Sequence, residues 1–382
     1  MVNILFSKIN LLVLLMLHWE TGYGVPVENS DDELVAVVAV SRHGDRAPFT
    51  SFPTDKYYNL TYWPMGFGQI TKKGIDRQYK LGQWLRHRYS SFLSEFYHTK
   101  EIYAWSTDID RTLMSAYASL AGMYPPKGYQ LWNEHISWQP IPVHIAPFLS
   151  LIENLGCPKF FSMLQKVKES VFPIYEEKHS ETLQYIANKT GWPKVSIEMV
   201  DELMDLLFTY EEHDLTFVPD WSKTMDHNIT RYLSAVVYEI QTHTVPLARL
   251  KIGTFYDYLF NFFNKFVDPI SLNGRIGITD PTAKNQKSKF VLVMAHESTL
   301  SAILNTMRAY NMKHIEYADT LLWELKKRKD GVHYLNVLYK TKSELSPVKI
   351  LKCDYNCNLE QAKNNLADVT ITKKRWHKEC LD

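Results

Sequence analysis

Residues 34–48, LVAVVAVSRHGDRAP, join an apolar run rich in valine to a basic cluster that contains a histidine. Such a run is typical of a strand buried on both faces of a mainly parallel sheet, where ligands bind beyond the carboxyl ends of the strands. Arg42 and Arg46 offer planar charged donors that match phosphate oxygens, and a neutral His43 can attack phosphorus. Gly44 allows a sharp turn or a close approach of the backbone. The stretch therefore predicts a phosphate site at a strand end; a basic surface turn with an idle histidine is the alternative.

Periodicity predicts further strands and helices around this strand. Segments 101–105 and 290–295 indicate strands, and 321–326 with 332–338 indicates a hairpin. Apolar residues recur at helical spacing after Thr71 and between 252 and 266, whereas β-branched runs thin out between 145 and 250. We therefore predict an α/β fold with a mainly parallel central sheet flanked by helices and a smaller helical cap. The predicted divisions are a signal peptide at 1–24, a catalytic domain at 25–144 and 251–382, and a cap insertion at 145–250.

Charge and the chain ends restrict the classes of partner. Lys plus Arg total 43 against 42 Asp plus Glu, a net charge of +1, so no general basic field favours nucleic acid. Lys8 precedes an apolar segment, 9–19, that is too short to span a bilayer and is followed by small residues near Gly24, as in a signal peptide. A buried N-terminal helix and a short membrane anchor are the alternatives. We expect an exported protein without a membrane anchor.

A second polar pair follows the second apolar run. His296 and Glu297 come directly after 290–295, and Ser298 or Thr299 can cap the helix that follows. A helix N-terminus adds backbone donors that suit an anion, although a solvated pair is the alternative. His-Glu also opens the zinc motif His-Glu-x-x-His, but position 300 is leucine, which argues against a metalloprotease.

The chain resembles the histidine acid phosphatases, whose signature is Arg-His-Gly-x-Arg-x-Pro after the first strand. The resemblance extends from about residue 34 to 380 and is carried by the signature and three further stretches, in the order of the family: Arg42–Pro48, Trp63–Thr71, Ser106–Ala116 and Trp138–His144. It implies a phosphoglycerate mutase-like sheet and an acid phosphatase that hydrolyses small phosphate monoesters without a cofactor or metal.

The resemblance also implies the role of each site residue. His43 is the expected nucleophile and forms a phosphohistidine, and Glu297 is the expected proton donor. Most family members have aspartate at this position, whereas insect members carry His-Glu. Arg111 would otherwise be taken for a surface ion pair, but the resemblance makes it phosphate-binding. The expected phosphate-binding residues are Arg42, Arg46, Arg111 and His296. Burial and bound phosphate are expected to raise the pKa of Glu297, while the arginines lower that of His43.

Cysteines and sequons fit an exported glycoprotein. The four cysteines allow three pairings by sequence alone, and irregular spacing disfavours a zinc site. The resemblance implies Cys157 with Cys380 and Cys353 with Cys357. Glycosylation is expected at Asn59, Asn188 and Asn228. Lysosomal family members carry a C-terminal membrane segment that this sequence lacks, so we expect secretion rather than a lysosomal location.

Three alternatives stay open. A phytase-like enzyme with a narrower substrate range would differ in its cap, and a non-catalytic secreted binding protein or allergen would keep the fold without turnover. The segment Trp138–His144 resembles the one through which several relatives dimerise, which predicts a homodimer. A Trp138 buried within its own chain is the alternative.

Overall fold

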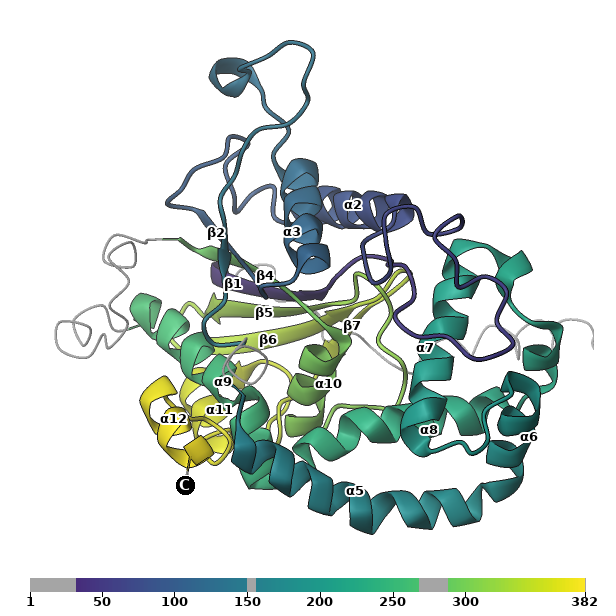
Figure 1. Cartoon of the computed structure of the whole chain (residues 1–382). Helices are drawn as coiled ribbons and strands as arrows, with labels where there is room; N and C mark the ends of the chain where they lie inside the picture. The colour runs from purple at the N-terminus through teal and green to yellow at the C-terminus, as the bar shows by residue number, and fades with distance from the viewer. Residues whose placement is uncertain (1–31, 150–155, 268–287, 382) are drawn as a thin grey trace, which may run out of the picture.

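One eight-stranded sheet forms the centre of the molecule (Figure 1). The computed structural model describes residues 32–149, 156–267 and 288–381. The strands are β1 (Glu33–Arg42), β2 (Ile102–Ser106), β3 (Val143–Ile145), β4 (Phe290–Ala295), β5 (Thr320–Lys327), β6 (His333–Lys340), β7 (Leu345–Val348) and β8 (Cys357–Asn358). The helices are α2 (Lys72–Arg88), α3 (Asp110–Met123), α5 (Pro158–Lys178), α6 (Ser180–Thr190), α7 (Ile197–His213), α8 (His227–Glu239), α9 (Val245–Val267), α10 (Glu297–Thr306), α11 (Leu359–Asn365) and α12 (Lys373–Leu381). The predicted signal peptide, 1–24, lies outside the described residues.

The sheet has a parallel half and an antiparallel half. Its order is β3-β2-β4-β1-β5-β6-β7, and β8 pairs with β6. β3, β2, β4 and β1 pair in parallel, whereas β5, β6 and β7 are antiparallel to their neighbours. The parallel half brings the carboxyl ends of β1, β2 and β4 to one edge of the sheet. The predicted α/β fold is confirmed, with the hairpin of β5 and β6 extending it.

Alternate residues of β1 pack into two cores on opposite faces of the sheet. Val37 and Ala39 join the core with α2 and α3, and Val38 and Val40 join the core with α9 and α10. Figure 1 shows these helix pairs on the two faces. The valine-rich run is continuous because both of its faces are buried, as predicted.

Helices α5, α6, α7 and α8 pack together around a third core, beside the main sheet (Figure 1). Ala47 and Phe52, from the loop after β1, contribute to this core, so the loop that carries the basic cluster lies against these helices. Helix α9 runs across position 250, the predicted end of the cap. The division into a catalytic domain and a cap stays a prediction.

Two disulfides join the pairs that the resemblance implied. Cys157–Cys380 links the residue before α5 to α12 across a sequence separation of 223, and Cys353–Cys357 closes a loop of separation 4. Trp138 is 40% exposed, so the alternative in which it is buried within its own chain is wrong. The side chains of all three sequon asparagines are exposed.

Candidate active site

Three strand ends bring the predicted site residues to one pocket. Its volume is about 430 Å³, and the predicted residues that line it are Arg42, His43, Arg46, Arg111, His296 and Glu297. β1 ends at Arg42, and β4 ends just before His296. Arg111 lies in the first turn of α3, shortly after the end of β2. The parallel order of β2, β4 and β1 therefore explains why residues far apart in sequence meet here.

Gly44 is required for the backbone of the signature loop to pack closely. A Cβ placed on Gly44 would collide with the carbonyl oxygen of Gly74 at the start of α2. Its N–H donates to the hydroxyl of Ser115 on α3 at 3.0 Å. The loop is thus held against two helices, which fixes the position of the adjacent His43.

The hydrogen bonds of His43 fix its tautomer. Its Nδ1 lies 2.8 Å from the carbonyl oxygen of Gly44, and a carbonyl can only accept, so Nδ1 carries the proton. The unprotonated Nε2 therefore keeps a free lone pair. Burial, followed by the charges of Arg42, His296 and Arg111, lowers the pKa of His43 well below its ordinary value. The predicted direction is correct, but burial is a larger cause than the arginines.

Three arginines supply the positive charge of the pocket. The buried Nε atoms of Arg42, Arg46 and Arg111 have no hydrogen-bond partner among the residues that the structure describes. Burial, followed by the charges of Arg46 and Arg42, lowers the pKa of Arg111 to about 10, so it stays charged in acid. The guanidinium carbons of Arg46 and Arg111 lie 3.8 Å and 4.8 Å from the ring centroid of Phe49. Unpaired donors on fixed cations suit an anion with several oxygens.

His296 lies between one hydrogen-bond donor and one acceptor, which suit a neutral ring. Its Nδ1 lies 3.3 Å from Nη2 of Arg111, which can only donate, so Nε2 carries the proton and donates to the hydroxyl of Thr107 at 2.9 Å. Burial, followed by the charge of Arg111, lowers the pKa of His296 well below its ordinary value. His296 thus connects the end of β4 to Arg111 at the start of α3.

The carboxylate of Glu297 accepts two hydrogen bonds through Oε1 and forms an ion pair through Oε2. Oε1 accepts from Nδ1 of His314 at 2.9 Å and from the N–H of Ile315 at 3.2 Å, while Oε2 lies 2.9 Å from Nη1 of Arg42. Burial raises the pKa of Glu297, but His314 and Arg42 outweigh it and lower the pKa below its ordinary value. The expectation of a raised pKa is therefore wrong for the protein without substrate, because these donors favour the ionised form.

The start of α10 also differs from the expectation. The helix begins at Glu297, and His296 is its N-cap residue. Ser298 and Thr299, predicted as caps, lie inside the first turn. The chain passes from β4 into the helix without an intervening turn, which places Glu297 at the helix N-terminus.

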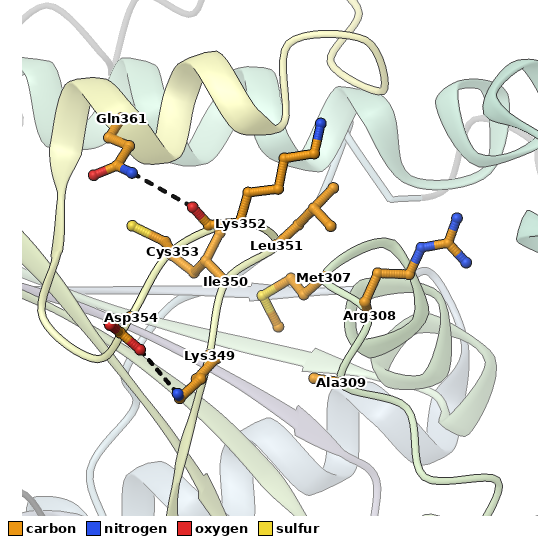
Figure 2. A pocket seen from close by; sticks show the side chains of 10 residues that line it. All are labelled: Met307, Arg308, Ala309, Lys349, Ile350, Leu351, Lys352, Cys353, Asp354 and Gln361. Carbon is orange, nitrogen blue, oxygen red and sulfur yellow. Dashed lines mark hydrogen bonds and ion pairs between the residues drawn. The ribbon is translucent and has the colours of Figure 1, made fainter.

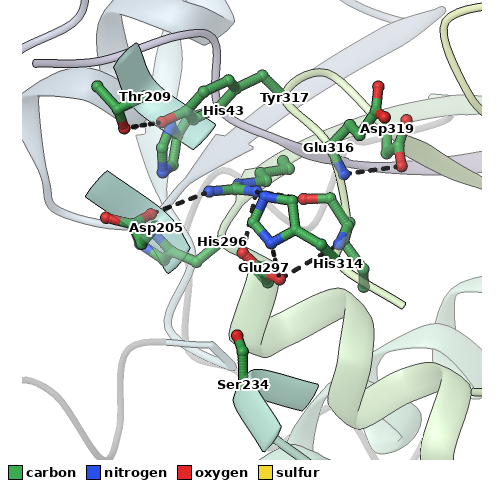
Figure 3. A network of polar contacts seen from close by, with 12 residues as sticks. His43, Asp205, Thr209, Ser234, His296, Glu297, His314, Glu316, Tyr317 and Asp319 are labelled. Carbon is green, nitrogen blue, oxygen red and sulfur yellow. Dashed lines mark hydrogen bonds and ion pairs between the residues drawn. The ribbon is translucent and has the colours of Figure 1, made fainter. Parts of the chain in front are cut away.

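Several residues at the site were missed from the sequence, and four of them contact the predicted arginines or Glu297 directly. Asp205 on α7 accepts from Nη2 of Arg46 at 2.6 Å and 2.7 Å. His314 and Tyr317 come from the loop between α10 and β5, and the guanidinium of Arg42 lies 4.4 Å from the ring centroid of Tyr317 (Figure 3). The fourth is Phe49. Their residue types and spacing match no motif, because they reach the pocket only through the tertiary fold.

A second hollow lies away from this site and is lined by none of the predicted catalytic or phosphate-binding residues. It has a volume of about 700 Å³, between the end of α10 and segment 349–354 (Figure 2). Lys349 pairs with Asp354 at 2.8 Å, and Gln361 donates to the carbonyl oxygen of Lys352 at 3.4 Å. The part of the chain that the structure describes holds no cluster of metal-ligating side chains and no helix that is long and apolar enough to cross a membrane.

Comparison with known proteins identifies the family. Residues 33–337 match the model of the histidine phosphatase superfamily, branch 2. Human lysosomal acid phosphatase is 33% identical over 362 residues, 90% of this chain and 79% of the relative. Bovine prostatic acid phosphatase is 30% identical over 393 residues, 98% of this chain and 93% of the relative. The chain therefore belongs to branch 2 of the histidine phosphatase superfamily.

The acid phosphatase activity predicted from the sequence is confirmed at the level of this family: the protein is an acid phosphatase, a phosphoric monoester hydrolase. Solved structures share its fold. The phytase of Hafnia alvei in complex with tartrate has a TM-score of 0.68 at 14% identity and covers 90% of this chain and 98% of its own. The phytase of Citrobacter braakii has a TM-score of 0.66 at 15% identity and covers 91% of this chain and 99% of its own.

Proposed function

We propose that the protein hydrolyses phosphate monoesters through a phosphohistidine on His43. Nε2 of His43 attacks phosphorus, and the bond to the ester oxygen breaks as Glu297 gives that oxygen a proton. Water then attacks the phosphohistidine, Glu297 takes the proton of the water, and phosphate leaves. Arg42, Arg46 and Arg111, with His296, bind the non-bridging oxygens and offset the charge that spreads over them in the transition state.

One observation carries this proposal: Nδ1 of His43 donates to the carbonyl oxygen of Gly44, so a neutral ring presents Nε2 in a pocket that three arginines line. An idle surface histidine would not need a fixed tautomer or burial. His43 is 3% exposed. The same observation disfavours a binding protein without turnover.

The test measures hydrolysis of an aryl phosphate from acid to neutral pH for the wild type, His43→Ala and Glu297→Ala. We expect His43→Ala to lose activity by at least a thousandfold, and Glu297→Ala by about a hundredfold or more. His135→Ala, at an exposed histidine, is the control and keeps full activity. Substantial turnover by His43→Ala would contradict the covalent mechanism, and an unchanged rate and pH profile for Glu297→Ala would remove its role as proton donor.

We further propose that the pocket prefers substrates with a single phosphate. Beyond the three arginines and the histidines His43 and His296, its described lining is acidic, hydroxylic or apolar. It includes Asp201, Glu202 and Tyr238. Burial raises the pKa of Asp201 well above its ordinary value, and no cation is paired with Asp201, Glu202 or Tyr238 among the described residues that line the pocket. A second phosphate would face these groups without a cation. A phytase-like activity is thus disfavoured, and faster hydrolysis of inositol hexakisphosphate than of glycerol phosphate would overturn this preference.

We propose that the protein is secreted as a glycoprotein. Two disulfides and three exposed sequon asparagines support an oxidising, extracellular setting. The named relatives are lysosomal and prostatic acid phosphatases, which leaves the compartment to be tested. Expression of the full chain in insect cells is expected to place activity in the medium, with a mass that falls on treatment with an N-glycosidase. Retention of all activity inside the cells would contradict secretion.

A homodimer through Trp138–His144 is also a proposal. Trp138 and Trp132 are 40% and 56% exposed, which leaves aromatic surface on the loop that projects from the sheet (Figure 1). Sedimentation of the wild type and of Trp138→Glu tests it. The wild type is expected to sediment as a dimer and the variant as a monomer; equal masses for the two would contradict the proposed interface.

A further inference from the structure

His314 bridges the expected proton donor and the phosphate-binding arginines. Its Nδ1 lies 2.9 Å from Oε1 of Glu297, and its Nε2 lies 3.0 Å from Nη1 of Arg42 (Figure 3). Phe208 of α7 packs against the ring at a centroid distance of 4.3 Å, which restricts its rotation. His314 is thus held by contacts from β1, α10 and α7.

The two contacts require opposite roles from the two ring nitrogens. Nη1 of Arg42 can only donate, so Nε2 of His314 accepts and Nδ1 carries the proton. Nδ1 therefore donates to Oε1 of Glu297, together with the N–H of Ile315 at 3.2 Å. With Oε1 taken by these two donors, Oε2 is the oxygen left toward Arg42 and the pocket. The ring selects which carboxyl oxygen faces the substrate.

We propose that His314 is a positioning residue that holds Glu297 retracted, with Oε2 toward the leaving group, and that steadies Arg42 through its other nitrogen. This inference rests on the proposed function of Glu297 as proton donor. Glutamate has one methylene more than aspartate, so its carboxyl group has more conformations to lose before it can donate. Two donors on Oε1 remove that freedom before the substrate binds. The charged groups that face His314 are Arg42 from β1, Glu297 from α10 and Asp205 from α7.

Two conservative variants distinguish the effect of the contact with Glu297 from that of the contact with Arg42. His314→Asn keeps a donor near the position of Nδ1 and loses the acceptor toward Arg42. His314→Gln keeps an acceptor near the position of Nε2 and loses the donor to Glu297. His314→Leu loses both. The control is His243→Leu, because His243 is an exposed histidine whose Nδ1 also contacts a carboxylate, that of Glu239 at 3.2 Å, and it does not line the pocket.

The measurement compares kcat/KM for glycerol phosphate, whose alcohol needs a proton to leave, with kcat/KM for p-nitrophenyl phosphate, whose phenolate leaves readily. We expect His314→Leu and His314→Gln to lose about tenfold to a hundredfold more on glycerol phosphate than on p-nitrophenyl phosphate, the effect of one hydrogen bond to a charged group. We expect His314→Asn to recover most of the glycerol phosphate kcat but to keep a raised KM on both substrates. His243→Leu is expected to match the wild type.

Equal losses of kcat/KM on the two substrates for His314→Leu and His314→Gln would overturn the proposal, because they would indicate that His314 has a structural role alone. Recovery of glycerol phosphate hydrolysis by His314→Gln rather than by His314→Asn would also overturn the proposal. Such a result would mean that only the contact with Arg42 affects the rate. If His314→Leu does not fold, the Asn and Gln variants decide the question. An inactive wild type would contradict the proposed function itself, which distinguishes that failure from a failure of this inference.

Discussion

The variant Asp205→Asn tests whether a carboxylate from α7 offsets the charge of Arg46 and Arg42 before phosphate binds. Asp205 accepts from Nη2 of Arg46 at 2.6 Å and 2.7 Å and lies 3.8 Å from Nη2 of Arg42. Removing one partner of a buried ion pair costs about 3–5 kcal/mol, because the remaining charge is left without compensation. The Asp205 side chain is 16% exposed, so we take the lower end, about 3 kcal/mol.

The expected loss is measurable by thermal unfolding. At about 2 cal/mol/K per residue, the unfolding entropy of a chain of 382 residues is about 0.8 kcal/mol/K, so 3 kcal/mol corresponds to a Tm lower by about 4 °C. Burial raises the pKa of Asp205, but Arg46 and Arg42 outweigh it and lower the pKa. The contribution is therefore fully present above the ordinary aspartate pKa, about 4, and is lost only as the pH falls through the lower folded value. Asp220→Asn, at an exposed pair with Lys223, is the control and leaves Tm unchanged.

The shift of Tm on binding inorganic phosphate provides a second measurement for this variant. In Asp205→Asn a bound phosphate replaces the missing negative charge, so saturating phosphate is expected to raise the Tm of the variant by more than that of the wild type. A smaller or equal phosphate shift in the variant would refute the reasoning. It would mean that Asp205 orients Arg46 for the anion and does not compete with the anion for that charge.

Further predictions concern the disulfides, the signature loop and pH. Replacing Cys157 and Cys380 by serine is expected to cost about 5 kcal/mol, against about 2 kcal/mol for the short disulfide, from the lengths of the loops closed; equal losses in denaturant titrations would refute the loop-length argument. Gly44→Ala places a methyl group against a backbone carbonyl and is expected to lower stability by about 1–3 kcal/mol in the same titrations. Phe49→Leu removes the ring under two guanidinium groups, so KM for an aryl phosphate is expected to rise several-fold while kcat changes less. For the wild type, kcat/KM is expected to fall as the pH rises above about 6, the second pKa of a phosphate ester.

The sequence was most informative where one strand carried both a core pattern and a chemical motif. In 34–48 the continuous apolar run predicted burial on both faces, and the residues that follow it line the pocket as predicted. His296 and Glu297 were found by the same reasoning from the run 290–295. Parallel neighbours end at the same edge, so the pattern alone brought the two segments together.

Contacts from irregular segments could not be predicted in this way. Asp205 lies on α7, where the hydrophobic pattern of the sequence predicts only which face is apolar. His314 lies in a loop, where the sequence has no periodicity. These two residues affect the charges of the site, because Asp205 pairs with Arg46 and His314 pairs with Glu297. In the protein without substrate the pKa of Glu297 is lowered for this reason: burial was foreseen, but the contacts with His314, Arg42 and Ile315 were not. The expected effect of bound phosphate on this pKa stays a prediction.

The lowered pKa of Glu297 changes how acid activity arises in the proposed mechanism. Without substrate, burial raises the pKa of Glu297, but its contacts with His314, Arg42 and the N–H of Ile315 lower that pKa below its ordinary value, which favours the ionised form. A phosphate ester that binds to Arg42 adds negative charge beside Oε2 and shares the cation that stabilised the carboxylate, and both effects favour protonation of Glu297. Below about pH 6 the ester itself arrives as a monoanion that carries a proton. Burial, followed by the charges of Arg42 and His296, lowers the pKa of His43 well below its ordinary value, which favours the neutral form of the ring. In the proposed mechanism, the proton that Glu297 gives to the leaving oxygen therefore enters the site with the ester.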